Sequence, residues 1–238
     1  MHEFTPLDGA LLIDKPSGPT SHDVVAELRR QFDIKKVGHC GTLDPAATGL
    51  LIIVLGRGTK LSEKLMGSDK VYEGTMKFGE TTDSYDADGE ITGTQLVPLM
   101  TLDELNQAAE KFEGDQMQLP PMVSAIKMDG VPLYKLARKG IEVERKERLV
   151  HIYRFRFLHY QEPVGTFRVA CTKGTYVRTI AHDLGQRLGC GAHLNSLRRT
   201  ASGQFDVANA TPLDTALRWS AAELERHVVP FLKLLQME

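Results

Sequence analysis

The chain has 238 residues, of which 42% are hydrophobic and 25% are charged, enough for one substantial core, alone or with a small appendage. No apolar run is long enough to cross a bilayer, and the charged Asp8, Asp14 and Lys15 argue against a signal peptide. The net charge of −2 argues against indiscriminate binding to nucleic acids. Three cysteines without paired spacing predict a reduced, cytoplasmic protein with no disulfide framework.

The N-terminal part of the chain predicts a strand followed by a helix. Residues 9–14 form a short apolar run that is typical of a strand. After a turn rich in proline and glycine, Ser21 is expected to cap a helix that continues to Phe32. Its inward face should carry Val24, Val25 and Leu28.

A glycine-rich loop at residues 38–49, GHCGTLDPAATG, runs into the unbroken apolar segment 50–56, which predicts a buried strand. Asp44 precedes a proline and should therefore be extended or in a turn. A carboxylate held at the rim of a core is well placed for chemistry. Alternatively, Asp44 caps a short helical turn that Pro45 begins and Gly49 ends.

The middle of the chain combines a strand, a loop and two helices. Residues 71–78 predict a half-exposed strand, and residues 79–93 an acidic loop. Thr101 and Glu104 form a capping box for a helix that Gly114 should end. A short basic helix is expected at residues 133–139, whereas the glycine-rich segment at 56–60 lacks the spacing of a phosphate loop and predicts a turn.

The C-terminal part predicts two further strands and two helices. Residues 150–157 alternate between apolar and polar side chains, with a bulge expected near Tyr153, and residues 167–171 form the next strand. Helices are expected at 176–188, ended by Gly189, and at 221–232. Strands and helices that do not alternate regularly indicate an α+β protein with a largely antiparallel sheet.

Charge is distributed unevenly along the chain. Nearly every charged residue between 79 and 120 is acidic, whereas the segment from Lys127 to Arg199 is predominantly basic. Such a basic half is either a phosphate-binding face or an ordinary solvated surface, and charge alone does not decide between them.

The loop at residues 38–51 resembles the catalytic loop of the TruB family of tRNA pseudouridine synthases. Four further segments resemble the same family in the same order, at residues 9–18, 70–72, 120–140 and 173–179. The resemblance covers most of the chain up to about Gly203. It implies the pseudouridine synthase fold, with a mixed, mostly antiparallel central sheet flanked by helices and an insertion that grips RNA.

The resemblance also implies a domain organisation. Residues 1–211 would form the catalytic domain, with the insertion at about 116–148. Residues 212–238 would be a short C-terminal tail, too short for the PUA domain that members of the family usually carry. Val123 and Cys40 depart from the tyrosine and threonine that many relatives have at these positions.

For the site, the resemblance implies that Asp44 is the essential carboxylate, that Arg178 is its cationic partner, and that Tyr72 is the active-site tyrosine. A buried carboxylate needs such a cation because desolvation alone would raise its pKa. An aromatic ring can stack on uracil, and its hydroxyl can reach a ring proton. Without the resemblance, Arg178 would be taken as a phosphate contact or a surface arginine, and Tyr72 as a core or sheet-surface tyrosine.

Three further residues match the substrate pocket of the family. Tyr176 and Leu197 would pack the flipped base, and His39 would contact flipped loop nucleotides, although each is equally compatible with a structural role. Lys15 matches the family's first motif and is given no catalytic role; the alternative is a solvated turn lysine. The expected chemistry needs neither a cofactor nor a metal.

The leading hypothesis is an isomerase that converts uridine to pseudouridine at position 55, in the T loop of tRNA, after flipping the base. A nucleoside or glycoside hydrolase would need a second carboxylate, and no pair stands out. A non-catalytic tRNA-binding or RNA-folding module would not need Asp44, Tyr72 and Arg178 together. A guide-RNA-dependent enzyme would need the C-terminal domain expected to be missing, so a monomer acting on the T arm without guide RNA or membrane is expected.

Overall fold

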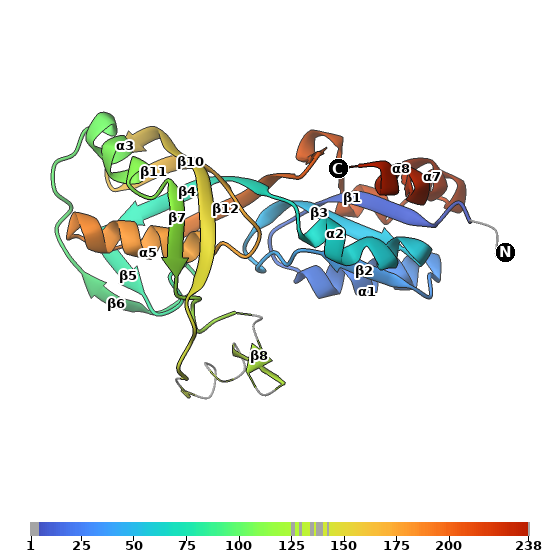
Figure 1. Ribbon diagram of the computed structural model, residues 1–238, viewed down its shortest axis with the longest axis horizontal. Coiled ribbons are helices and arrows are strands. Elements are labelled where there is room, and N and C mark those ends of the chain that lie inside the picture. The colour runs from blue at the N-terminus through green and yellow to red at the C-terminus, as the bar shows by residue number, and fades with distance from the viewer. Residues whose placement is uncertain are drawn as a thin grey trace. The chain divides into compact units, whose positions relative to one another are not determined.

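The computed structural model describes residues 5–124, 127–128, 130–133, 136, 140–141 and 143–237, and element labels follow Figure 1. The chain divides into two compact units, one formed by residues 1–72 and 198–238 and the other by residues 73–197. Strands β4 (Lys70–Phe78) and β12 (Ala192–Ser202) each have residues in both units. The units are described separately below.

The first unit is built on β3 (Thr48–Leu55), whose last six residues are all buried, as the apolar run at 50–55 predicts. β3 pairs antiparallel with β1 (Gly9–Lys15) along one edge and with β2 (Val37–Cys40) along the other, and Thr48 and Gly49 at its start pair in parallel with Arg198 and Arg199 of β12. The smaller strands are β13 (Phe205–Asp206), β14 (Thr211–Pro212) and β15 (Val229–Pro230). The helices are α1 (Ser21–Phe32), α2 (Ser62–Met66), α6 (Leu213–Ala216), α7 (Ala221–His227) and α8 (Phe231–Gln236), with 3₁₀ helices η1 (Gly56–Leu61) and η2 (Val207–Asn209).

Helix α1 has the predicted bounds and buries Val24, Val25 and Leu28. The predicted cap is wrong, because Thr20 is the N-cap and forms a capping box with Asp23. Ser21 is the first helical residue, and its hydroxyl instead pairs with the main chain of Leu43. Sequence offers two adjacent hydroxyls at this helix start, and the tertiary partner decides which of them caps it.

The second unit has strands in the order β4, β11 (Val164–Cys171), β10 (Arg148–Gln161) and β7 (Gly114–Gln118). Helices α3 (Leu102–Glu110) and α5 (Val177–Leu188) accompany these strands, and α3 contacts both β10 and α5 (Figure 1). The aromatic rings of Phe155, Phe157 and Phe167 pack against one another in its core. Two small hairpins are formed by β5 (Glu80–Thr82) with β6 (Ile91–Thr94) and by β8 (Lys127–Met128) with β9 (Val131–Pro132).

Most strand pairs are antiparallel, which confirms the predicted mixed, mostly antiparallel α+β architecture. The predicted bulge near Tyr153 is confirmed by a register shift between Ile152 and Arg154. The left-handed end of α5 at Gly189 and the capping box of α3 at Thr101 are confirmed as well.

Four predicted elements differ in the structure. Helix α3 ends before Gly114, which instead begins β7, and the acidic loop at 79–93 contains the hairpin of β5 and β6. The single helix expected at 221–232 is wrong, because the chain extends at Val228 and Pro230 and separates α7 from α8. The turn at 56–60 is a 3₁₀ helix, and the helix expected at 133–139 lies largely outside the described residues.

Candidate active site

The loop between β2 and β3 places Asp44 at the rim of the first unit, half-buried. No helix begins at Asp44, so the alternative in which it caps a helical turn is wrong. Its carbonyl oxygen instead accepts a hydrogen bond from Ala47 N at 3.1 Å, which closes a turn. Gly49 has φ +99°, and a Cβ there would collide with the main chain of Arg199 on β12. The chain can therefore leave the loop and enter β3 only with a glycine at this position.

Two fully buried cations hold the main chain of this loop. Lys15 Nζ donates to the carbonyl oxygens of Pro45 at 3.0 Å and Ala47 at 2.8 Å, and also to Pro16 at 2.8 Å. Arg199 donates from Nε to Leu50 O at 2.7 Å and from Nη2 to Gly41 O at 3.0 Å. The alternative in which Lys15 is a solvated turn lysine is therefore wrong. Its ammonium group holds the loop through two carbonyl groups, those of Pro45 and Ala47.

Burial lowers the pKa of Lys15 to about 8 from an ordinary 10.5, although the charges of Asp44 and Asp23 oppose this shift. Between these values the unfolded chain keeps a proton that the folded chain has released, so folding becomes more favourable as pH rises through the window. We expect the free energy of unfolding of the wild type, relative to that of Lys15→Met, to increase by up to about 3 kcal/mol from pH 8 to pH 10.5. Urea denaturation of both proteins at the two pH values measures it, and a difference that stays constant would contradict the assignment.

His39 and Tyr72 are the other two predicted site residues of the first unit. His39 lies on β2, opposite Ile53 of β3, and is half-buried. Burial, reinforced by the charges of Arg199 and His22, lowers the pKa of the His39 ring, which is therefore neutral at neutral pH. Its buried Nδ1 has no hydrogen-bond partner among the described residues. Tyr72 is half-buried on β4.

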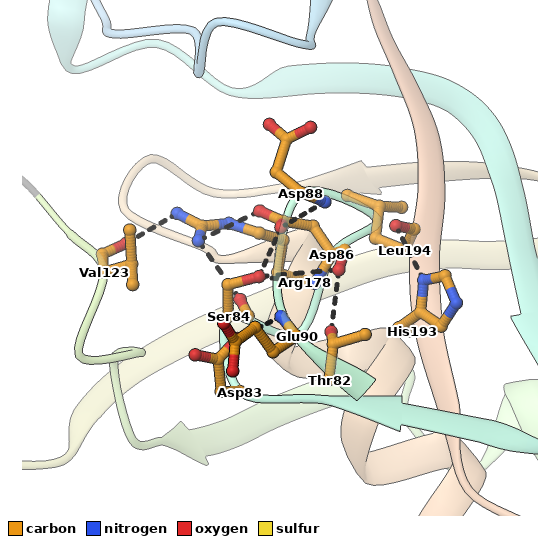
Figure 2. A network of polar contacts seen from close by, with 10 residues as sticks. All are labelled: Thr82, Asp83, Ser84, Asp86, Asp88, Glu90, Val123, Arg178, His193 and Leu194. Carbon is orange, nitrogen blue, oxygen red and sulfur yellow. Dashed lines mark hydrogen bonds and ion pairs between the residues drawn. The ribbon is translucent and has the colours of Figure 1, made fainter. Parts of the chain in front are cut away.

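Arg178 is the second residue of α5, and only 4% of it is exposed. Its Nη1 lies 3.3 Å from Asp86 Oδ2 and donates to Ser84 O at 3.2 Å, while its Nη2 donates to Val123 O at 2.8 Å (Figure 2). The alternative of an exposed surface arginine is therefore wrong. These three contacts hold the guanidinium group in one orientation and restrict rotation about the bonds of the side chain.

Asp86 is a site residue that sequence reasoning missed. It belongs to the acidic loop between β5 and β6, where Thr82 Oγ1 donates to Asp86 O at 2.7 Å and Asp88 N to Asp86 Oδ1 at 3.2 Å (Figure 2). Leu194 N donates to Tyr85 O at 3.0 Å and ties the loop to β12. The aspartates and Gly89 signal a turn in the sequence, but nothing local links that turn to an arginine in α5.

Tyr176 and Leu197 complete the predicted set, and both are half-buried in the second unit. Tyr176 occupies the N-cap position of α5, where the side chain of Gln118 donates to its carbonyl at 3.1 Å and accepts from its N–H at 2.7 Å. Leu197 lies on β12. The first unit thus holds His39, Asp44 and Tyr72, and the second holds Tyr176, Arg178 and Leu197. The pairing of Asp44 with Arg178 stays a prediction.

Within the described part of the chain, no group of three or more His, Cys, Asp or Glu side chains could hold a metal ion. Across these same residues, no helix is long and apolar enough to cross a membrane. The three cysteines are all free and buried.

Two family profiles match the chain in succession. The TruB family pseudouridylate synthase N-terminal domain matches residues 29–177, and the tRNA pseudouridylate synthase B C-terminal domain matches residues 178–236. Both describe pseudouridylate synthases, and the fold agrees with that class. The chain belongs to the TruB family of pseudouridylate synthases.

Individual relatives support the same assignment. The chain is 56% identical over 224 residues to tRNA pseudouridine synthase B of Opitutus terrae, covering 94% of this chain and 93% of the relative. It is 45% identical over 228 residues to the protein of that name from Haemophilus influenzae Rd, covering 94% and 73%. Among solved structures, the chain is similar to one in the crystal structure of a Cbf5-Nop10-Gar1 complex, with a TM-score of 0.76 and 28% identity. That match covers 96% of this chain and 62% of the other, and confirms the pseudouridine synthase fold.

Proposed function

We propose that this protein isomerises uridine 55 in the T loop of tRNA to pseudouridine, with Asp44 as the essential carboxylate. Membership of the family along nearly the whole chain carries the proposal, since it makes the protein a tRNA pseudouridine synthase, an isomerase that modifies RNA. The reaction breaks the N-glycosidic bond, turns the uracil and joins C5 to C1′. It requires a flipped nucleotide and one ionised oxygen that acts as nucleophile or base.

In this proposal Arg178 keeps Asp44 ionised and oriented. A desolvated carboxylate needs a fixed cation, and Arg178 is a buried guanidinium whose plane is already set by Asp86, Ser84 and Val123. The negative charge of Asp86 offsets part of the positive charge of Arg178, so Arg178 attracts the Asp44 carboxylate with moderate strength. A pre-organised cation of this kind needs little rearrangement when RNA binds.

The remaining pocket residues bind the flipped nucleotides. Tyr72 stacks on the uracil, while Tyr176 and Leu197 form an aromatic and an aliphatic wall. His39 contacts neighbouring loop nucleotides through a neutral ring, so it contributes hydrogen bonding rather than charge. These roles are supported by residue types, by half-burial and by the family's motifs.

The arginines of the basic half differ in their availability to RNA. Arg178 and Arg199 are buried, and three exposed or half-exposed arginines pair with glutamates: Arg154 with Glu113, Arg156 with Glu110 and Arg168 with Glu73. Lys146 and Arg148 are exposed at the C-terminal end of the predicted insertion. We propose that phosphate contacts are made mainly by the insertion and its flanks.

Binding of a T-arm hairpin should therefore weaken steeply as salt rises, because bound phosphates release counterions. We expect Lys146→Ala and Arg148→Ala each to reduce the slope of log K against log salt by about one. Arg168→Ala, which removes an arginine already paired with Glu73, is the matched control and should leave the slope nearly unchanged. Titrations between low and physiological salt measure all three, and a salt-independent affinity would refute this assignment.

The protein is further proposed to act as a cytoplasmic monomer without guide RNA. The relatives named tRNA pseudouridine synthase B are 45% to 56% identical to this chain, whereas the chain from the Cbf5-Nop10-Gar1 complex is 28% identical. Three free, buried cysteines suit a reducing compartment.

The direct test is to map pseudouridine in a T-arm hairpin before and after incubation with the protein alone. We expect one modified position, and none when that uridine is replaced by cytidine. Tight binding without any product would favour the alternative of a non-catalytic RNA-binding or RNA-folding module.

A further inference from the structure

We propose that Ser21 is a positioning residue that holds Asp44 in its reactive orientation through the main-chain N–H and C=O of Leu43. The inference rests on the proposed role of Asp44. The Ser21 hydroxyl donates to Leu43 O at 3.0 Å and accepts from Leu43 N at 2.8 Å, so one side chain satisfies both polar groups of the residue before Asp44. Sequence patterns suggest only a helix cap for Ser21, and Thr20 already fills that role.

The contact is sealed from solvent. Ser21 is 1% exposed and Leu43 is 2% exposed. Water therefore cannot replace the hydroxyl, and its removal would leave a buried N–H and a buried carbonyl without partners. New partners for these two groups would require rotation of the peptide planes on either side of Leu43, and this rotation would move Asp44.

Hydrogen bonds to the main chain on both sides of residues 43 and 44 confine such a movement to these two residues. Arg199 holds Gly41 O at 3.0 Å, and Lys15 holds Pro45 O at 3.0 Å. Gly18 N also donates to Pro45 O, at 2.9 Å. With positions 41 and 45 held independently, loss of the Ser21 hydroxyl should shift residues 43 and 44 while the rest of the loop stays in place. A displacement of about 1 Å in a catalytic group can cost on the order of 10²-fold in rate.

Ser21→Ala tests this inference, with Thr20→Ala as the matched control. Both substitutions remove one hydroxyl at the start of α1, but Thr20 is exposed and caps the helix, whereas Ser21 contacts the loop. Single-turnover rates at saturating protein, normalised to the fraction that binds a T-arm hairpin, separate reactivity from folding. We expect Ser21→Ala to lower the rate about 10- to 100-fold with hairpin affinity nearly unchanged. Thr20→Ala should lower the melting temperature with a normal rate.

Ser21→Cys provides a second readout, because a thiol is a weaker donor and acceptor than a hydroxyl. Its rate should lie between those of Ser21→Ala and wild type. A wild-type rate in Ser21→Ala, or equal rate losses in Ser21→Ala and Thr20→Ala, overturns the inference. Asp44→Asn, measured alongside, separates the proposed role of Asp44 from that of Ser21. If Asp44→Asn retains activity, the proposed role of Asp44 fails. If Asp44→Asn is inactive and Ser21→Ala has a wild-type rate, only the role of Ser21 fails.

Discussion

Asp44→Asn should abolish pseudouridine formation while leaving the fold and RNA binding intact. Asparagine is nearly the same size, and the loop around it is held by Lys15 and Arg199 through main-chain carbonyl groups that the substitution does not touch. The change removes the negative charge and the reactive oxygen. We expect the single-turnover rate to fall by about 10⁴-fold or more, the scale seen when an essential catalytic group is removed. Pseudouridine mapping on a T-arm hairpin measures the product.

Hairpin affinity, titrated on the same preparation, should be unchanged or slightly tighter, because a repulsion between Asp44 and phosphate is lost. Asp214→Asn is a suitable control, since it removes an exposed carboxylate whose contacts are with the nearby Arg218 and Thr215. That variant should retain full activity. Activity that survives in Asp44→Asn would refute the assignment of this aspartate.

Most of the secondary structure could be predicted because its signals are local. The apolar run at 50–55 predicts a buried strand, and alternation at 150–157 predicts a strand with a bulge near Tyr153; the structure contains both. Predictions failed where a neighbour in space decides the outcome. Ser21 could have capped α1, but Leu43 engages its hydroxyl and Thr20 takes the cap. Pro230, by contrast, was a local signal against a continuous helix at 221–232.

For the candidate site, too, local motifs could be predicted from the sequence and contacts between distant residues could not. Motif resemblance selected Asp44 and Arg178, but periodicity and spacing could not show that Lys15 is fully buried beneath the Asp44 loop. Nor could they connect Asp86 to Arg178, because the ion pair joins a turn to a helix that begins about ninety residues later. Long-range polar contacts leave no periodic trace in a sequence, whereas each of them is evident once the chain is folded.

Arg178→Lys should be costly although it retains the charge. The guanidinium uses Nη1 toward Asp86 and Ser84 and Nη2 toward Val123, and a single ammonium group cannot occupy both positions. We expect turnover to fall about 10²- to 10³-fold, the scale of losing one pre-organised electrostatic group, with a lower melting temperature because a buried carbonyl group loses its donor, and with nearly normal hairpin affinity. Arg168→Lys is the matched control, because Arg168 is exposed and pairs with Glu73, where a point charge suffices, so its turnover should stay at the wild-type level. If Arg178→Lys also turned over like wild type, Arg178 would not be the partner of Asp44, and another cation would have to keep that carboxylate ionised. Lys15 would then be the first candidate, since its pKa already responds to the charge of Asp44.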